Sequence, residues 1–450
     1  MADEPIPALL PRGAGHHFLI YGDSCSGVPG AQHEQTFAAV NAVVRRLSPQ
    51  PDFILFPGDE VIGLTPDPAA LRGQWRHWLD VEMGWLDRQR TPIWHTTGNH
   101  TAYDAMSEAV FRDVLALPPN GPPGQEGLSY WVRRGNLLLV FVHTLWTGLG
   151  GEGHVETDWL RATLNAHADA RYKIVLGHHP VFPINGFEGN CQREIAHEDR
   201  ARFWGILVDA GVLAYVCSHI LAFDVQVHRG VLQLCTAGAG TAHRMPEGVE
   251  YLHCVQAALD AEGLRYQVLD TDGVVREALA WPPRLTDGLP WVAIGPGERE
   301  AGFSGQVAGF VELRCAGRTA SRPWAPAQTF FSAFEDGALA PLWVGLRGAR
   351  QTLTVIVGRR PGRSPLYWLG PDLAPGQDFD LHIGFHPAMG PGGILVRDHD
   401  EPRWTSCTGA SATGIEQLAW PGRWSIGQGQ TGPSDRPFAG TALTVAIHAP

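Results

Sequence analysis

The sequence predicts an α/β domain followed by an all-β sandwich, and three observations carry this prediction. In the amino-terminal part, apolar strand-like runs alternate with segments of helical periodicity, which is typical of βαβ units. Five of these runs end in an Asp, Asn or His, the side chains that collect ligands at the edge of such a sheet. From about Gly295 onward the helical periodicity disappears, and short runs separated by Gly and Pro indicate a sandwich or jelly roll.

The elements of the first domain can be assigned in chain order. Helical spacing of apolar residues predicts helices over residues 35–47, 71–86, 157–166 and 198–210. Apolar runs predict strands over residues 18–22, 52–56, 93–98, 128–133, 137–143, 172–177, 213–218 and 231–235. Two further runs, 251–258 and 264–269, are expected to pair as a hairpin. We therefore expect a lead-in over 1–15, an α/β domain over 16–283 and a sandwich over 295–450.

Composition narrows the class of partner and the compartment. The formal net charge of -12 argues against binding to a nucleic-acid backbone, and no Lys/Arg cluster contradicts this. No apolar signal-peptide core follows the acidic first residues, and no apolar run is long enough to span a bilayer. We therefore expect a cytoplasmic protein with no membrane partner. The seven cysteines are scattered and odd in number, which favours buried free thiols for all but Cys25.

The stretch Pro57-Gly58-Asp59-Glu60 is the centre of the predicted site. Asp59 is left at the carboxyl end of a buried strand, after a Gly that allows a tight turn. Four more runs deliver similar side chains at their ends, namely Asp23, Asn99 with His100, His178 and His219. Metals that activate water require oxygen and imidazole ligands on rigid elements, so this set predicts a metal site in which Asp59 can bridge two ions.

Five motifs in order carry a resemblance to a known family: Gly22-Asp23, Gly58-Asp59, Gly98-Asn99-His100, Gly177-His178-His179-Pro180 and Ser218-His219. They resemble the motifs of the calcineurin-like metallophosphoesterases, including their purple-acid-phosphatase-like bacterial branch. The resemblance implies a four-layer αββα sandwich and a transition metal such as Fe, Mn or Zn. It also implies that Asp59, Asn99, His178 and His219 hold one ion, with Asp59 shared. Independently of the resemblance, the neighbouring His100 is expected to protonate the leaving oxygen as general acid.

The chain departs from the family pattern at the first metal position. Cys25 stands where the family commonly has a His, Leu221 replaces a second His, and Ile62 replaces the Tyr of the purple-acid variant. Asp23 and Asp59 remain, and Cys25 is either a new thiolate ligand or a small buried thiol. The position is therefore either empty or weak, or rebuilt with Cys25 and another histidine. The candidates for that histidine are His143, His154 and His228.

The expected function is hydrolysis of a phosphomonoester or phosphodiester by a metal-activated water. We expect one tightly bound ion, with room for a second. A non-catalytic binding protein that has lost half of a dinuclear centre is the alternative, and a mononuclear enzyme acting on a different bond is a third. His100 favours an enzyme, whereas Leu221 favours the binding protein.

The carboxyl third resembles the concanavalin/laminin-G type of sandwich. Residues 379–385 and the following Pro391-Gly392-Gly393-Ile394-Leu395 carry this likeness. It implies carbohydrate binding, substrate gating or an oligomer contact. The expected partner is a small phosphate ester, with a carbohydrate-linked substrate as an alternative. Trp404, Trp420 and Trp424 are either a sugar-stacking platform or, more simply, part of the sandwich core.

Overall fold

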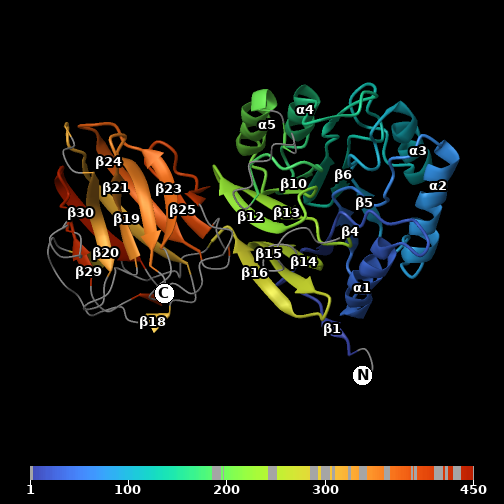
Figure 1. Cartoon of the computed structure of the whole chain (residues 1–450), viewed down its shortest axis with the longest axis horizontal. Helices are drawn as coiled ribbons and strands as arrows, with labels where there is room; N and C mark the ends of the chain where they lie inside the picture. Colours follow the sequence, from blue (N-terminus) through green and yellow to red (C-terminus); the bar gives the residue numbers. More distant parts are fainter. Residues whose placement is uncertain are drawn as a thin grey trace. The chain divides into compact units, whose positions relative to one another are not determined.

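The computed structural model divides the chain into two compact units (Figure 1). The first comprises residues 1–225 and 231–282, and the second residues 226–230 and 283–450. The structure describes residues 4–184, 194–195, 197–241, 251–283, 292–294, 305–306, 310–322, 326–333, 342–358, 365–386, 389, 393–409, 419–420, 424–428 and 437–448. Within these residues, no helix is long and apolar enough to cross a membrane.

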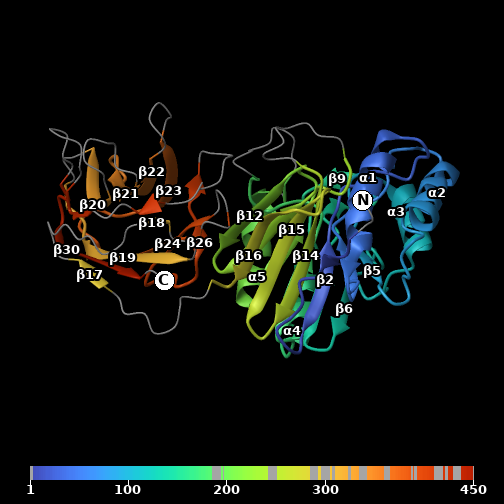
Figure 2. The ribbon, with the colours of Figure 1, turned by 90° about the horizontal axis from the view of Figure 1, so that it is seen from below.

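The first sheet of the first unit has six strands in the order β16-β15-β14-β2-β4-β5. One half of this sheet is parallel and consists of β2 (His16–Ile20), β4 (Phe53–Phe56) and the edge strand β5 (Ile93–His95). The antiparallel strands β14 (His253–Asp260), β15 (Gly263–Asp270) and β16 (Val275–Trp281) extend it. Figure 2 shows β16, β15, β14 and β2 side by side. The predicted hairpin is confirmed as β14 and β15.

The second sheet has the order β12-β13-β11-β10-β7-β6. The strands β7 (Leu137–Phe141), β10 (Tyr172–Leu176), β11 (Ala214–Cys217) and β13 (Val231–Thr236) are parallel. The edge strands are β6 (Tyr130–Arg134), antiparallel to β7, and β12 (Phe223–His228).

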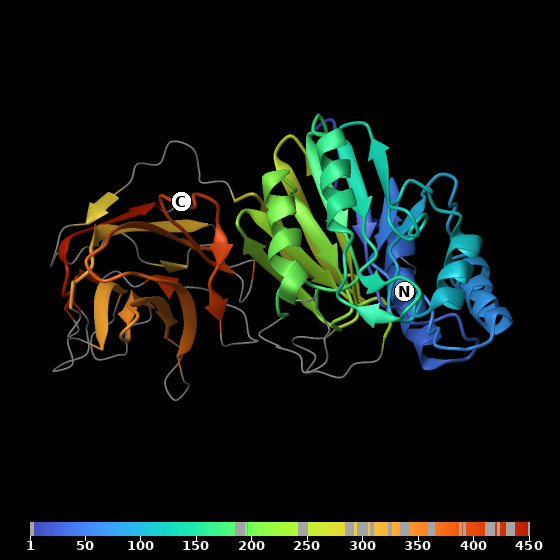
Figure 3. The same ribbon diagram turned by 90° about the horizontal axis from the view of Figure 1, so that it is seen from above.

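Helices cover the outer face of each sheet (Figures 1 and 3). The elements α1 (Gln32–Arg46), α2 (Pro68–His77), the π-helical η1 (Trp78–Glu82) and α3 (Ala105–Leu115) share an apolar cluster with the first sheet. The helices α4 (Thr157–Ala166) and α5 (His197–Asp209) share another with the second sheet. The four predicted helices are confirmed, although the predicted helix 71–86 is divided between α2 and η1.

The two sheets are stacked, which makes four layers. Leu19 and Ile54 pack against the helices, while their neighbours Phe18 and Leu55, on the opposite face, are equally buried. A direct contact joins the sheets: the Tyr130 hydroxyl donates to the carbonyl of His95 at 2.7 Å and accepts from its N–H at 3.0 Å. The predicted αββα architecture is therefore confirmed.

The second unit contains two six-stranded sheets with antiparallel pairing, and a short ladder of β18 (Gly305–Gln306) with β28 (Ala419–Trp420). The strands of one sheet are, in spatial order, β17 (Val292–Ile294), β30 (Thr441–His448), β19 (Val311–Arg318), β24 (Asp378–Phe385), β25 (Ile394–Arg397) and β26 (Thr405–Ser406). The strands of the other sheet are, in spatial order, β27 (Thr408–Gly409), β23 (Leu366–Asp372), β22 (Thr352–Val357), β21 (Leu342–Arg347), β20 (Ala327–Ala333) and β29 (Trp424–Ile426). Alternate residues of both sheets form one apolar core, so the predicted all-β domain is confirmed.

Three predictions on the second unit and the cysteines have different outcomes. Trp424 is fully buried in the sandwich core, which confirms the core interpretation for this residue. The likeness to concanavalin and laminin-G sandwiches stays a prediction, and Pro391-Gly392 of its motif lies outside the described residues. The five described cysteines other than Cys25 are free and buried, as predicted. Cys25 is also buried and forms no disulfide, and Cys191 lies outside the described part.

Candidate metal centre

The carboxyl ends of five strands meet at one site in the first unit. Asp23, Asp59 and Asn99 follow β2, β4 and β5 of the first sheet, whereas His178 and His219 follow β10 and β11 of the second. Parallel strands present their carboxyl ends at the same edge, and stacking the sheets brings the two edges together. The predicted convergence of these side chains is therefore observed, and it uses both sheets.

His178 lies in the middle of this group and is fully buried. Its Nε2 lies 3.1 Å from Asn99 Oδ1, 3.1 Å from His219 Nδ1 and 3.2 Å from Asp59 Oδ2. Its Nδ1 lies 2.9 Å from the Pro57 carbonyl oxygen, which can only accept, so Nδ1 carries a hydrogen. One proton on Nε2 cannot point at three neighbours, whereas a cation among them would be attracted by all four atoms. Two imidazoles, a carboxylate and an amide oxygen are a donor set that suits a transition metal.

The two carboxylates are held by backbone and hydroxyl donors. Asp59 Oδ1 accepts from the His100 N–H at 2.9 Å, which leaves Oδ2 facing His178. Asp23 Oδ2 accepts from the His219 N–H at 2.9 Å and from the Ser218 hydroxyl. Asp23 thus links the end of β2 to the end of β11, and one oxygen of each carboxylate lies within 4.8 Å of His178.

The backbone at the site is strained. Asp23, Cys25, Asp59 and His219 have φ angles of 61°, 40°, 56° and 69°, a left-handed conformation that costs a non-glycine residue about 1–2 kcal/mol. Gly98 is required by close approach, since a Cβ atom there would lie 2.0 Å from Asp59 Oδ1. Such strain persists only where surrounding structure over-determines it, and it is concentrated at functional sites.

Burial and the neighbouring charges shift the pKa values of these groups. Burial alone would lower the pKa of His178, but the Asp59 carboxylate and its hydrogen bond raise it to about 10. Burial alone would raise the pKa of Asp59, yet His178 outweighs it and lowers the value. Burial raises the pKa of Asp23 to about 6. In the absence of a cation, a proton on His178 supplies the positive charge that the carboxylates require.

Cys25 and His100 lie beside Asp59. The Cys25 sulfur, an Asp59 oxygen and a ring nitrogen of His100 all lie within 4.8 Å of one another. His100 Nδ1 lies 2.7 Å from the Ile62 carbonyl and donates to it, so Nε2 is left with its lone pair. Burial, and then the charges of Asp59 and Asp23, raise the pKa of the Cys25 thiol well above its usual range. The thiol therefore stays protonated unless a cation stabilises the thiolate.

The three histidines considered for the first metal position lie elsewhere. Among the described residues, no close group of metal-ligand atoms includes His143, His154 or His228. His154 Nε2 instead lies 3.1 Å from Glu156 Oε1. His100 is the histidine that the structure brings to Cys25.

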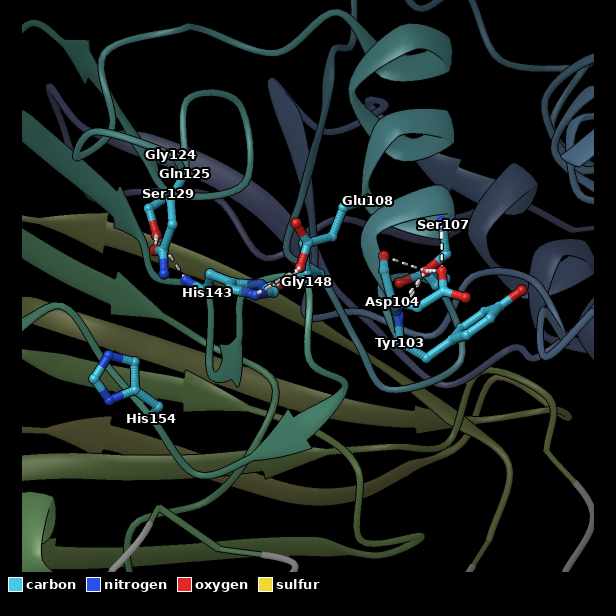
Figure 4. Close-up of polar contacts among 12 residues, drawn as sticks. Tyr103, Asp104, Ser107, Glu108, Gly124, Gln125, Ser129, His143, Gly148 and His154 are labelled. Atoms are coloured by element: carbon cyan, nitrogen blue, oxygen red, sulfur yellow. Dashed lines mark hydrogen bonds and ion pairs between the residues drawn. The ribbon is translucent and has the colours of Figure 1, made fainter. Parts of the chain in front are cut away.

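His143 belongs to a buried group that the sequence did not reveal (Figure 4). Its Nδ1 lies 2.7 Å from Thr97 Oγ1, and its Nε2 lies 3.7 Å from Glu108 Oε1, which accepts from the Gly148 N–H at 2.6 Å. Burial lowers the pKa of His143 to about 3, so this imidazole is neutral. Because Thr97 immediately precedes Gly98, the group supports the loop that carries Asn99 and His100. The only sequence signal was the position of His143 at a strand end.

Two comparisons with known proteins concern the sequence of this chain. Residues 16–223 match the family model described as calcineurin-like phosphoesterase. A search of curated proteins found no match.

A search of solved structures matches this chain to proteins that include the following three. A dimetal phosphatase from Danio rerio is 14% identical over 59% of this chain and 99% of that chain, with a TM-score of 0.42. The purple acid phosphatase PPD1 from yellow lupin seeds is 12% identical over 60% of this chain and 55% of that chain, with a TM-score of 0.45. GAP50, the anchor in the inner membrane complex of Plasmodium, is 15% identical over 59% of this chain and 88% of that chain, with a TM-score of 0.42.

Proposed function

We propose that the first unit hydrolyses a small phosphate monoester or diester with the help of a bound transition metal. The observation that carries this proposal is the convergence of Asp59, Asn99 and His219 on Nε2 of His178 at 3.1–3.2 Å. The family match over residues 16–223 supports the same class of reaction.

Asp59, Asn99, His178 and His219 would hold the ion, and Fe, Mn or Zn suits their oxygen and imidazole donors. A bound transition ion supplies two effects, a lower pKa for water and neutralisation of phosphate charge. The hydrogen bond that His178 Nδ1 donates to the Pro57 carbonyl orients His178, and the one that Asp59 accepts from the His100 N–H orients Asp59, before substrate arrives. Because these side chains are already held in place, little free energy is needed to order them when the ion binds.

Asp23, Asp59 and Cys25 would form a second, weaker position in the same centre. Its atypical members are Cys25, in place of an imidazole, and Leu221, which offers no ligand atom. Carboxylates and one buried thiol, whose pKa must fall before it can ligate, hold an ion less tightly than the His178 set does.

His100 would be the general acid. Its backbone N–H is fixed on Asp59, and its Nδ1 is bonded to Ile62, so the ring presents Nε2 for proton transfer. This role requires the imidazolium form, in which Nδ1 keeps its hydrogen bond to Ile62 while Nε2 carries the proton that the leaving oxygen takes as its bond to phosphorus breaks.

Replacement of Asp59 tests the proposal. Asp59→Asn should remove one equivalent of bound metal and reduce hydrolysis of bis(p-nitrophenyl) phosphate to background, because the neutral amide no longer balances the cation. The matched control is Asp113→Asn, the same chemical change at a 64% exposed carboxylate. Elemental analysis and circular dichroism accompany the rate measurement. A folded Asp59→Asn variant with full metal content and full turnover would contradict the proposal, and wild-type protein that binds metal without hydrolysis would favour the binding-protein alternative.

A further inference from the structure

A second group of metal-ligand side chains lies outside the proposed centre. It consists of Glu34 in the first turn of α1, His77 at the end of α2 and Glu82 at the end of η1. None of the three belongs to the strand-end motifs or was singled out by the sequence. One ligand atom from each lies within 4.8 Å of the other two.

The distances within this group bracket those of a metal site. His77 Nε2 lies 2.6 Å from Glu34 Oε1 and 3.8 Å from Glu82 Oε1. Ligand atoms around a tetrahedral Zn²⁺ are about 3.3 Å apart, given metal–ligand bonds of about 2.0–2.1 Å. Side-chain shifts of under about 1 Å would therefore bring these ligand atoms to the spacing of a Zn²⁺ site. A side chain has roughly this freedom within one rotamer. One imidazole and two carboxylates are a set that Zn²⁺ accepts.

The Glu82 carboxylate gives a second observation that favours a cation at this group. Its side chain is only 4% exposed, and Oε1 accepts from the Ser26 hydroxyl at 2.5 Å and the Gly27 N–H at 3.1 Å. The other oxygen, Oε2, is buried and has no hydrogen-bond partner among the described residues. A buried carboxylate oxygen without a partner is costly, and the nearby Glu34 carboxylate adds repulsion.

The group can be reached from solvent. A cavity of about 630 Å³ is lined by His77 together with Gly27, Val28, Gly73, Gln74 and Asp80. The side chains of Glu34 and His77 are 27% and 15% exposed, so an ion could enter from their side while Glu82 closes the inner side.

From these observations we infer that Glu34, His77 and Glu82 form a structural site for a divalent transition cation, of which Zn²⁺ is the test case. The ion would fix the loop over residues 24–30. Ser26 and Gly27 hold Glu82, the Gly30 N–H donates to Glu34, and His33 Nδ1 lies 2.9 Å from the Cys25 carbonyl oxygen. The site would thus steady the backbone that positions Cys25 beside Asp59 without contributing a ligand to that centre.

Zn²⁺ binding in a variant with a disabled centre tests the inference. Asp59→Asn with His178→Ala removes two proposed ligands of the centre, and this protein should still bind one Zn²⁺ per chain by elemental analysis after dialysis. Adding His77→Ala should reduce the count to zero. Adding Glu34→Gln instead should weaken binding by at least about tenfold in calorimetry, in line with the loss of one ligand. Hydrogen exchange of residues 24–30 should slow when Zn²⁺ is added, and only where His77 and Glu34 are intact.

The matched control is His16→Ala, which removes a histidine bonded to Asn136 and should leave the Zn²⁺ count at one. Two results would overturn the inference: a folded Asp59→Asn, His178→Ala protein that binds no Zn²⁺, or an unchanged count after His77→Ala. If His77→Ala does not fold, an unchanged affinity in the Glu34→Gln protein overturns it equally. None of these results depends on hydrolysis, so the inference can fail while the proposed phosphoesterase function holds.

Discussion

At the scale of single residues, Cys25 would determine what the proposed second metal position can hold. Its sulfur is buried next to Asp59 and His100 and carries a raised pKa, so it becomes a ligand only when a cation displaces its proton. A thiolate ligand leaves a spectroscopic mark that oxygen and nitrogen ligands do not. Spectroscopy can therefore show whether Cys25 binds a metal, separately from metal binding elsewhere in the chain.

Titration with Co²⁺ should give a sulfur-to-cobalt charge-transfer band in the near ultraviolet. The band should develop only after the tighter position is filled, because Cys25 must first lose its proton. Cys25→Ser should abolish it, and Cys407→Ser, at a buried thiol of the second unit, should leave it intact. A titration without the band, in wild-type protein that binds Co²⁺, would mean that Cys25 is a buried thiol that fills space.

His100 should matter most for poor leaving groups. An alkoxide needs a proton in the transition state, whereas nitrophenolate leaves without one, and general acid catalysis contributes about 10²–10⁴-fold. His100→Ala should therefore slow alkyl phosphate esters by about that factor and nitrophenyl esters far less. The comparison is made on kcat/KM for the two ester classes. Equal losses on both classes would instead identify His100 as a ligand beside Cys25 or as a structural residue.

The sequence predicted most of the side chains that converge at the candidate centre because placement at a strand end is a local property. Asp23, Asp59 and His178 each follow an uninterrupted apolar run, and parallel pairing then brings them to one edge. The proximity of Cys25 to His100 could not be predicted, because it depends on left-handed turns at Cys25 and Asp59. The order of residues contains no direct signal for those turns, since neither residue is a glycine.

At the scale of elements, the sequence analysis missed helix α3, although its first residues carry a clear start signal. Asp104 accepts from the Ser107 N–H at 2.7 Å in a capping box, and this signal marks the start of α3, which the periodicity of apolar residues did not reveal. The predicted helix 71–86 shows the opposite error. Its apolar spacing is continuous, but the π-helical turn of η1 is set by packing of Trp78 and Met83 rather than by spacing.

Strand β16 carries a titratable group whose effect on stability can be measured. Glu277 accepts from the Tyr251 hydroxyl at 3.3 Å, and burial raises its pKa to about 7 from an ordinary value of 4.5. A raised carboxyl pKa contributes stability that is fully present below about pH 4.5. That contribution is lost as the pH rises through about 7.

Glu277→Gln should remove this dependence on pH. Between pH 4.5 and pH 8 the free energy of unfolding of wild type should fall by about 1–3 kcal/mol relative to the variant. Taking the difference between wild type and variant cancels the other titrating groups. Urea denaturation at several pH values measures it, and parallel curves for the two proteins would contradict a raised pKa at Glu277.

At the scale of the whole molecule, the chain has separate apolar cores. Among the described residues, the buried members of the two clusters of the α/β unit lie between 19 and 269, and those of the sandwich cluster lie between 311 and 447. Every residue of the proposed centre comes from the first unit. The sequence predicted this division because the change from helical periodicity to short alternating runs is visible over tens of residues.

A chain ending at residue 283 should therefore fold and keep the centre. We expect the same metal content, and kcat/KM on bis(p-nitrophenyl) phosphate within about twofold of the full chain, because no ligand or general acid is removed. A modest loss of thermal stability is expected, since Val227 and Arg229 donate backbone hydrogen bonds to Ser406 and Thr405 at 2.9 Å. Comparison of a small aryl ester with a carbohydrate-linked phosphate ester then tests the sandwich: an unchanged rate on the first and a loss on the second would assign it to substrate binding. Loss of metal from a folded, truncated chain would contradict a centre built from the first unit alone.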